Sequence, residues 1–191
     1  MFLFFTFGPM VAEEIKYQTR KAFDIEYGVN EKTEAKNEKI SILVPSNKDF
    51  SIIIPKIGAV APIVADIDPF SPNEYLPALK EGAAHAAGTS KPGELGNTYI
   101  FAHSTDAFYN VGTYNAVFYL LWKLEENDEI YIYYKGKQYV YEVSDKKIVT
   151  SADVKYLGDL GGKTLTLQTC YPPGTTLKRL IVIAEQIEDN N

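Results

Sequence analysis

Short strands follow one another from residue 50 to residue 187, and almost no helix separates them. Runs of β-branched, aromatic and other apolar residues alternate with turns that contain glycine or proline, and Lys135-Gly136-Lys137 is the clearest hairpin turn. This pattern predicts about eight strands in a mainly β fold. Because the edge strands of an open sheet would leave backbone groups unpaired, we expect the sheet to close into a mainly antiparallel barrel.

Turn residues also place the expected elements along the chain. Ser71, Pro72 and Gly82 are typical of the cap, the first turn and the stop of a short helix. The tripeptide Asp68-Pro69-Phe70 is interpreted as a loop that leads into this helix. In chain order, the sequence predicts two strands within 50–68, the helix within 71–82, a short strand around His85, a strand over 98–103, a helix over 109–124, a hairpin over 130–150, and two final strands over 159–170 and 179–188.

The size and the charge of the chain limit its organisation and its partners. Its 191 residues suffice for one domain with a substantial core, which we place at residues 48–191. The formal net charge of −6 argues against nucleic acid as a partner. A single cysteine cannot form an internal disulfide bond, so a protein in an oxidising compartment would keep this thiol only for a reason.

The region before this domain falls into two parts. Residues 1–12 are strongly apolar but shorter than the roughly 20 residues of a membrane span, and they lack the basic region and cleavage site of a signal peptide. We interpret them as the outer end of a truncated membrane anchor, and a buried first strand or helix is the alternative. Residues 13–47 are polar and charged, which predicts a short helix or extended stalk followed by a flexible linker. We expect residues 1–47 to be dispensable for folding.

Cys170, the one cysteine, lies at the end of the alternating run "TLTLQTC". Alternation puts Leu165 and Leu167 on one face of the strand, and Gln168 and Cys170 on the other. The rigid loop "YPPGTT" follows, so the thiol lies at a strand end beside a surface loop, where catalytic groups are often held. A small, inert core residue is the alternative interpretation of a lone cysteine.

Arg179 and a histidine could join this thiol. Arg179 opens the next strand, so a hairpin over the intervening loop would bring Arg179 and Cys170 to adjacent strand ends. His103 also ends a strand, whereas His85 precedes a Gly/Pro-rich loop and is expected to organise it. A Cys, a His and an Arg at three strand ends would supply a nucleophile, a proton carrier and a donor to an oxyanion. Taken singly, each of these residue types more often has a structural role.

Three segments of the chain together resemble the sortase family. They are "LTLQTC" with Arg179 nine positions after Cys170, "HAAGTSKPGELGNTYIFAHS" with its PGE-x-GN turn before His103, and the opening strands "SIIIPKIGAVAPIV". The resemblance covers roughly residues 48–187. It implies a closed, eight-stranded sortase-type β-barrel with short helices.

The resemblance also implies a function. Sortases are membrane-anchored cysteine transpeptidases that cleave an LPXTG-like sorting signal between Thr and Gly and join the threonine to an amine. The implied partners are proteins that carry such a signal and the amine of a peptidoglycan precursor. Residues 1–12 would then belong to an N-terminal anchor, with the barrel on the extracellular face of the cell membrane.

The same motifs imply the roles of individual residues. By position, Cys170 is expected to be the nucleophile, His103 the acid and base, and Arg179 the donor to the substrate carbonyl and oxyanion. No cofactor and no metal are expected. The residues beside the catalytic candidates are expected to bind the substrate: Thr169, Ala102 and Ser104.

Several alternatives remain at this point. The chain has Ala102-His103-Ser104 where many sortases have Gly-His-Arg or Gly-His-Asn, so the subclass is open. We favour attachment of proteins to the cell wall, with polymerisation of pilins as the alternative within the family. A thiol hydrolase or an L,D-transpeptidase-like enzyme would usually place its Cys close after a His-Gly pair, and no such pair precedes Cys170. The non-enzymatic alternative is a β-barrel binding module with an incidental cysteine.

Overall fold

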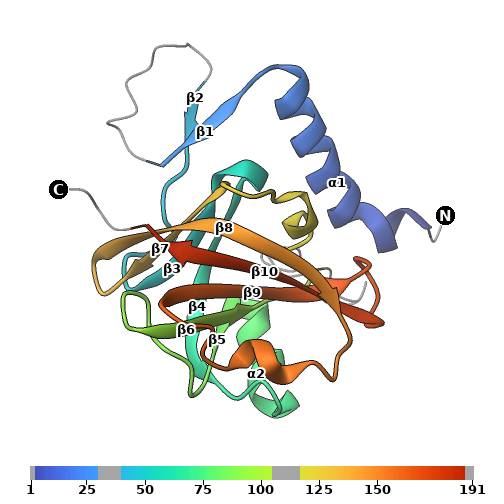
Figure 1. Cartoon of the computed structure of the whole chain (residues 1–191). Helices are drawn as coiled ribbons and strands as arrows, with labels where there is room; N and C mark the ends of the chain where they lie inside the picture. Colours follow the sequence, from blue (N-terminus) through green and yellow to red (C-terminus); the bar gives the residue numbers. More distant parts are fainter. Residues whose placement is uncertain (1–2, 30–39, 105–116, 188–191) are drawn as a thin grey trace.

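A closed barrel of eight strands forms the centre of the molecule in the computed structural model, which describes residues 3–29, 40–104 and 117–187 (Figure 1). The strands are β3 (Phe50–Ile54), β4 (Ala59–Ile67), β5 (Ala83–Ala86), β6 (Gly96–Phe101), β7 (Glu129–Tyr134), β8 (Lys137–Val149), β9 (Lys163–Tyr171) and β10 (Lys178–Gln186). Around the barrel they follow the order β10-β8-β7-β3-β4-β5-β6-β9, and β9 pairs with β10 to complete the ring. The predicted fold class is therefore confirmed.

Within the barrel, most neighbouring strands run antiparallel, and two pairs run parallel. The hairpin turn between β7 and β8 places Lys135 at a φ of 49° and Gly136 at a φ of 78°, which is the left-handed pair that a two-residue hairpin turn requires. β4 and β5 run parallel, so the chain must cross over between them, and helix α2 (Pro72–Glu81) makes this connection. β6 and β9 are the second parallel pair. The helix predicted after Ser71 and the loop before it are both confirmed.

Side chains of the barrel alternate between two buried layers. Those that point inward, such as Ile100 of β6 and Leu167 of β9, fill the barrel with apolar groups. Those that point outward from β6, such as Tyr99 and Phe101, pack with side chains of α2 and of the 3-10 helix η3 (Val154–Leu157). In Figure 1, α2 and η3 lie together outside the barrel, next to β5 and β6. The strands β6 and β9 are thus held from both faces.

Buried polar bonds fix β9 against β6. Asn97 of β6, only 3% exposed, donates from Nδ2 to the backbone oxygen of Tyr156 at 2.7 Å. Its Oδ1 accepts from the hydroxyl of Thr166 at 2.9 Å and from that of Thr164 at 3.3 Å. A shift of β9 would leave these buried groups without partners, at a cost of about 1–3 kcal/mol each. The bonds therefore help to set the register of the strand that carries Cys170.

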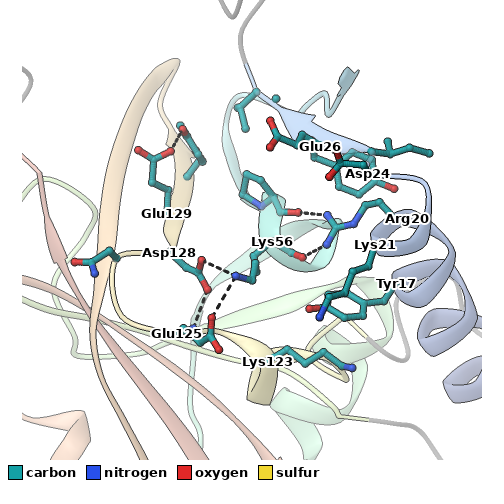
Figure 2. A pocket seen from close by; sticks show the side chains of 17 residues that line it. Tyr17, Arg20, Lys21, Asp24, Glu26, Lys56, Lys123, Glu125, Asp128 and Glu129 are labelled. Atoms are coloured by element: carbon teal, nitrogen blue, oxygen red, sulfur yellow. Dashed lines mark hydrogen bonds and ion pairs between the residues drawn. The ribbon is translucent and has the colours of Figure 1, made fainter. Parts of the chain in front are cut away.

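Arg20 makes one of the attachments between the N-terminal helix α1 (Leu3–Ala22) and the barrel. Arg20 donates from both terminal nitrogens to backbone oxygens of the 3-10 helix η1 (Pro55–Ile57), and the bond from Nη1 is 2.8 Å long (Figure 2). Its guanidinium carbon also lies over two aromatic rings, 5.3 Å from the centroid of Tyr17 and 4.8 Å from that of Tyr27. A cation that satisfies two carbonyls between two aromatic faces is a specific attachment.

Two short strands extend this attachment. β1 (Glu26–Gly28) follows α1 and pairs in parallel with β2 (Ile40–Ile42). Tyr27 of β1 packs so closely on Gly58 that an added Cβ at Gly58 would lie 2.7 Å from the ring. Gly58 also has a φ of 66°, so both the close approach and the backbone conformation favour glycine there.

A cavity of about 710 Å³ lies between α1, η1 and the segment that leads into β7 (Figure 2). Two lysines of its lining pair with carboxylates. Lys123 binds Glu14 of α1 at 2.8 Å, and Lys56 binds Asp128 at 3.3 Å. Lys123 also lies over the ring of Tyr17, 4.2 Å from its centroid. The contacts of Lys123 therefore join α1 to the barrel, whereas the pair of Lys56 and Asp128 joins η1 to the segment before β7.

These contacts add to the expectation for residues 13–47. Residues 13–22 form the second half of α1, which is the short helix of the two predicted alternatives, and this helix and β1 dock on the barrel, which the sequence does not indicate. The reason is that cations, aromatic rings and backbone oxygens make the contact, and these leave no apolar stripe in the sequence. The linker expected at 30–39 lies outside the described residues. No helix within the described residues is long and apolar enough to cross a membrane.

One correction concerns the helix predicted over 109–124. Residues 105–116 lie outside the described residues, and the rest forms a turn and the 3-10 helix η2 (Leu121–Lys123). Phe118, Leu121 and Leu124 are buried in the barrel core. Lys146 donates from Nζ to the backbone oxygens at the end of η2, that of Leu124 at 2.5 Å, so the chain turns away into β7. Core packing and this cap therefore override the helical spacing.

We expect Arg20→Ala to release α1 from the barrel without unfolding the barrel. The change removes two charge-assisted hydrogen bonds and two cation–π contacts, which together are worth about 1–3 kcal/mol. Hydrogen exchange measured by mass spectrometry should become roughly 10–100-fold faster over residues 13–28 and stay unchanged in β9. Lys21→Ala, one position along the same helix, is the control. Equal protection of 13–28 in both variants would contradict the attachment through Arg20.

Candidate active site

A groove of about 470 Å³ lies where β6, β9 and β10 meet their loops. The end of β6 supplies Phe101 and His103, β9 supplies Gln168 and Cys170, and β10 supplies Arg179. Part of α2 and the loop between β9 and β10 complete the lining. The cysteine, the histidine and the arginine that the sequence selects therefore line one groove. No group of His, Cys, Asp or Glu side chains among the described residues is arranged to hold a metal ion.

Cys170 and Arg179 lie opposite each other on adjacent strands. They are direct partners in the antiparallel register of β9 and β10. Their Cα atoms are therefore about 4.5–5.5 Å apart, and their side chains leave the sheet on the same side. The hairpin that the sequence predicts over the intervening loop is confirmed. Cys170 is partly exposed and forms no disulfide bond, as a reactive thiol requires.

The side chain of Arg179 is held at the mouth of the groove by backbone oxygens. Its Nη1 donates to the backbone oxygen of Thr176, just before β10, at 3.2 Å and to that of Lys178, the first residue of β10, at 3.1 Å. A guanidinium has five N–H donors in one plane, so these two bonds leave capacity for a substrate oxygen. The end of the β9–β10 loop and the first residue of β10 thus orient the arginine.

His103 follows β6 and remains beside β9. Phe101 is the partner of Gln168 in the parallel register, and the backbone N–H of Ala102 donates to the backbone oxygen of Gln168 at 3.1 Å. The ladder thus continues one residue past the end of β6. If this register were extended by two residues, His103 would come level with Cys170, and both residues line the groove. The histidine and the arginine therefore reach the groove from the two strands that flank β9.

The three residues that the sequence predicts to bind substrate are largely buried. Ala102 and Thr169 line the groove, but they are only 6% and 3% exposed, and Ser104 is 2% exposed. The hydroxyl of Thr169 donates to the backbone oxygen of Ala102 at 2.9 Å. This bond ties the chain before His103 to the chain before Cys170. Direct contact of these three residues with a substrate stays a prediction.

An apolar wall faces these strand ends. Tyr75, Leu76 and Leu79 of α2 line it together with Pro69 of the preceding loop. Leu79 is buried in the layer under the helix, whereas Leu76 is 46% exposed. Sequence analysis assigned no part of the site to this helix, because its apolar spacing is equally typical of a helix that only packs on a core. Only the structure shows that Leu76 is exposed beside Pro69 and so forms part of the groove.

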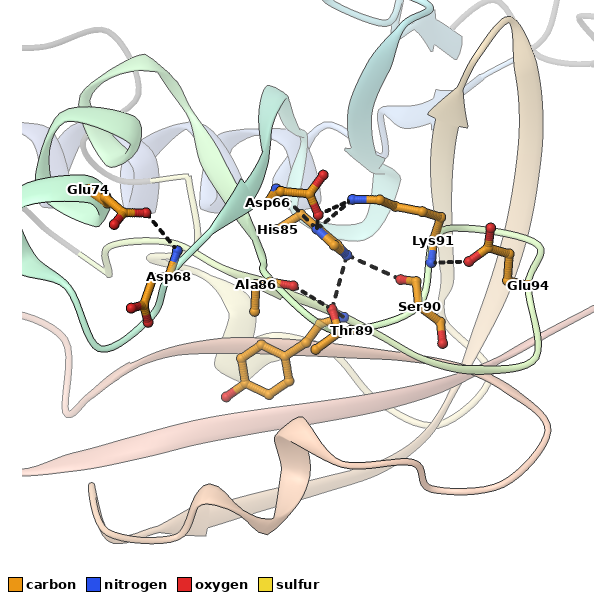
Figure 3. A network of polar contacts seen from close by, with 10 residues as sticks. Asp66, Asp68, Glu74, His85, Ala86, Thr89, Ser90, Lys91 and Glu94 are labelled. Carbon is orange, nitrogen blue, oxygen red and sulfur yellow. Dashed lines mark hydrogen bonds and ion pairs between the residues drawn. The ribbon is translucent and has the colours of Figure 1, made fainter.

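His85, the second histidine, has a different environment inside the molecule (Figure 3). It is fully buried on β5, and its ring packs 5.8 Å from that of Phe50. Its Nε2 lies 3.0 Å from the hydroxyl of Thr89 and 3.2 Å from the backbone oxygen of Ser90. Since the Thr89 hydroxyl donates to another carbonyl at 2.8 Å, Nε2 carries the proton and donates to the loop. The expectation that His85 organises this loop agrees with these contacts.

The other ring nitrogen of His85 is surrounded by donors. The backbone N–H of Asp66 lies 3.3 Å from Nδ1, and the Lys91 ammonium lies 3.2 Å from it. A proton on Nδ1 would face both donors, although the Asp66 carboxylate, 3.5 Å away, would partly compensate. Burial, reinforced by the Lys91 cation, lowers the pKa of His85 below its usual 6.5. The structure thus favours a neutral, structural His85.

The chain matches the protein-family model described as "Sortase domain" over residues 52–187. The match begins in β3, ends after β10, and so covers the whole barrel and the groove. Among curated proteins, the chain is similar to Sortase D of Bacillus subtilis (strain 168), with 27% identity over 180 residues. This alignment covers 92% of the chain and 82% of the relative.

Solved structures give the same picture. The chain is similar to a Sortase D5 transpeptidase of Clostridium perfringens, with a TM-score of 0.61 and 29% identity over 74% of this chain and 80% of that one. It is also similar to the Group B Streptococcus Pilus Island 1 Sortase C2, with a TM-score of 0.62 and 26% identity over 73% of each chain. These similarities agree with the barrel fold.

We expect His85 to make the stability of the fold pH-dependent. The unfolded imidazole takes up a proton near pH 6.5, whereas the folded one does so only at lower pH. Its contribution is therefore complete above about pH 6.5 and is lost as the pH falls toward the folded-state pKa. Urea unfolding of His85→Gln, which keeps a donor near Nε2, should give a lower stability at pH 7 but a flatter decline down to pH 5. Parallel declines in the two proteins would contradict this prediction.

Proposed function

Because the chain belongs to the sortase family, we propose that it is a cysteine transpeptidase that cleaves an LPXTG-like sorting signal between Thr and Gly and transfers the threonine to an amine of a cell-wall precursor. The observation that supports this proposal is the groove: Cys170 faces Arg179 in the register of β9 and β10, and His103 lines the same groove from the end of β6. A nucleophile between a donor and a proton carrier is the arrangement that acyl transfer requires.

The first half of the reaction would form a thioester. His103 takes the thiol proton, and the sulfur of Cys170 attacks the threonine carbonyl, so that a C–S bond forms and the carbonyl electron pair moves to oxygen. When the tetrahedral intermediate collapses, the C–N bond to glycine breaks. His103 returns the proton to the departing amine. The sorted protein is then held on Cys170 as a thioester.

The second half would reverse these steps with a different amine. The acceptor amine attacks the thioester carbonyl, His103 takes a proton from it, and the C–S bond breaks. The thiol of Cys170 is restored, and the threonine is joined to the acceptor through a new amide bond. Arg179 would stabilise the oxyanion in both halves, because its planar donors lie beside the thiol in the register of β9 and β10.

The apolar wall supports a peptide of this composition. Tyr75, Leu76 and Pro69 offer an exposed apolar surface next to the polar strand ends. The leucine and proline of an LPXTG-like signal could pack against such a wall while the threonine carbonyl lies over Cys170. We further propose that the protein acts at the cell surface and is anchored through residues 1–12, which would place the groove near exported proteins that carry such signals.

Pilin polymerisation is the second candidate within the family. One solved neighbour is a sortase of a pilus island, which favours this alternative for the same groove. The two candidates differ in the acceptor, which is a peptidoglycan-precursor amine in the first and the ε-amine of a pilin lysine in the second.

One experiment tests the proposal and separates these candidates. The full chain is incubated with LPXTG-type peptides and with a panel of amines that includes glycine-type, diaminopimelate-type and lysine side-chain acceptors. Mass spectrometry should detect a peptide cut after threonine and joined to an acceptor, and Cys170→Ala should give none. Preference for the lysine side chain would favour pilin polymerisation. An intact peptide with every amine would contradict the transpeptidase proposal for these signals.

We expect the two histidines to respond differently to alanine substitution. His103→Ala should reduce turnover by about 10²–10⁴-fold at unchanged stability, which is the usual effect of losing a positioned proton carrier. His85→Ala should cost roughly 2–4 kcal/mol of stability, because it empties a buried site and leaves donors unpaired. Turnover is measured below the melting temperature of each variant. A folded His85→Ala as inactive as His103→Ala would contradict the assignment.

We expect Arg179→Lys to lose much of the activity. The ammonium keeps the charge but not the planar set of donors, and one oxyanion donor is worth roughly 3–4 kcal/mol, or about 10²–10³ in rate. Arg179→Ala should lose more, and Cys170 should remain open to alkylation in both variants. Steady-state turnover and the rate of iodoacetamide alkylation are the measurements. Near-normal turnover in Arg179→Lys would exclude the oxyanion role and leave a purely electrostatic one.

A further inference from the structure

Gln168 is a polar residue of the groove that takes no part in the proposed acyl transfer by Cys170, His103 and Arg179. We infer that its side-chain amide binds the sorting signal by donating to a main-chain carbonyl near the scissile bond, so that Gln168 is a substrate-binding residue of this site. The inference rests on the proposed function, because it assumes that a peptide lies over Cys170. Three observations carry it: the position of Gln168, the state of its amide, and the commitments of the neighbouring polar groups.

The position of Gln168 places it under the same peptide as the thiol. It precedes Cys170 by two residues on β9, so both side chains leave the strand toward the groove, about 6.6–7 Å apart. Gln168 is partly exposed, unlike its neighbours Leu167 and Thr169, which are buried. An extended peptide that passes over Cys170 therefore also passes over Gln168.

A buried tyrosine fixes the orientation of the Gln168 amide. The hydroxyl of Tyr99 donates to Oε1 of Gln168 at 2.5 Å, and Tyr99 itself is 3% exposed. Burial raises the pKa of this phenol, with partial opposition from the Arg179 cation, so the hydroxyl keeps the proton that it donates. Because Oε1 accepts from Tyr99, the two N–H donors of Nε2 take no part in this bond and are available to an acceptor in the groove that Gln168 lines.

Neighbouring hydroxyl groups of the groove already donate within the protein. Thr169 donates to the Ala102 oxygen at 2.9 Å, and Thr175 donates to the Pro172 oxygen at 2.8 Å. Gln168 differs from both threonines because its side-chain bond to Tyr99 uses the acceptor oxygen Oε1 and not the amide N–H groups. An N–H donor in a groove that binds peptide is suited to a carbonyl oxygen. It is not suited to an amine or to the apolar side chains of the signal.

The spacing indicates which part of the signal is read. If the threonine carbonyl lies at Cys170 and Arg179, a residue one or two positions away lies above Gln168, since extended chains advance about 3.3–3.5 Å per residue. In an LPXTG-like signal this region includes X, the position whose side chain varies. A donor to the main-chain carbonyl binds there whatever that side chain is.

The test measures steady-state transfer of LPXTG-type peptides by the full chain. Gln168→Leu keeps the size of the side chain and removes its donors, so kcat/KM should fall about 3–10-fold, mainly through a higher KM. Gln168→Glu keeps the acceptor for Tyr99 but presents a carboxylate to the carbonyl, so the fall should be at least about 10-fold. Tyr99→Phe, which frees the amide to rotate, should give a smaller rise in KM.

The controls separate this inference from a structural effect and from the proposed function. Gln138→Leu on β8, away from the groove, should leave the kinetics unchanged, and the uncharged variants Gln168→Leu and Tyr99→Phe should keep the wild-type rate of Cys170 alkylation. The loss in Gln168→Leu should be the same for peptides with Ala, Glu or Lys at X. The inference would be overturned by a wild-type KM in both Gln168 variants, or by a loss of kcat/KM that is confined to peptides with one particular residue at X. If the wild-type chain transfers the peptides in that experiment, the proposed function still stands. A wild-type chain that transfers none of the peptides would overturn both.

Discussion

The candidate site depends on the hydrogen-bonded ladders that join β9 to β6 on one side and to β10 on the other. Backbone pairing alone places Cys170 opposite Arg179, and it places the end of β6, which His103 follows, beside Gln168. A shift of β9 by one residue would turn Cys170 into the barrel and Leu167 out of it. The buried bonds of Asn97, far from the groove, therefore matter for chemistry because they resist such a shift.

The same periodicity explains why so much could be predicted from the sequence. Alternation in "TLTLQTC" assigns Cys170 to the polar face, and the short proline-rich loop leaves a hairpin as the simplest connection to Arg179. The barrel follows from the number of strands and the cost of open edges. His103 could be located at a strand end, but only the parallel pairing of β6 with β9 brings it beside the thiol, and no local pattern encodes that pairing.

The features that sequence analysis missed share a different physical origin. Arg20 binds backbone oxygens of η1, Lys146 caps η2, and Tyr99 holds Gln168, and each contact joins residues that are distant in the chain. The bonds of Arg20 and Lys146 go to backbone carbonyls, which every residue type supplies, and the bond of Tyr99 joins two side chains on different strands. Such contacts produce no periodic pattern and no bias in composition. Only the three-dimensional structure therefore shows the docking of α1, the shape of the segment before β7 and the bond that holds the Gln168 amide.

The docking of α1 also sets the reach of the enzyme. A helix of 20 residues is about 30 Å long, and Arg20 fastens its last turn to the barrel. Any segment attached ahead of Leu3 is therefore joined to the barrel by a stiff rod and not by a loose tether. A stiff rod limits the volume that the groove can sweep and the directions that it can face, so it raises the frequency of productive encounters within that volume and removes encounters outside it.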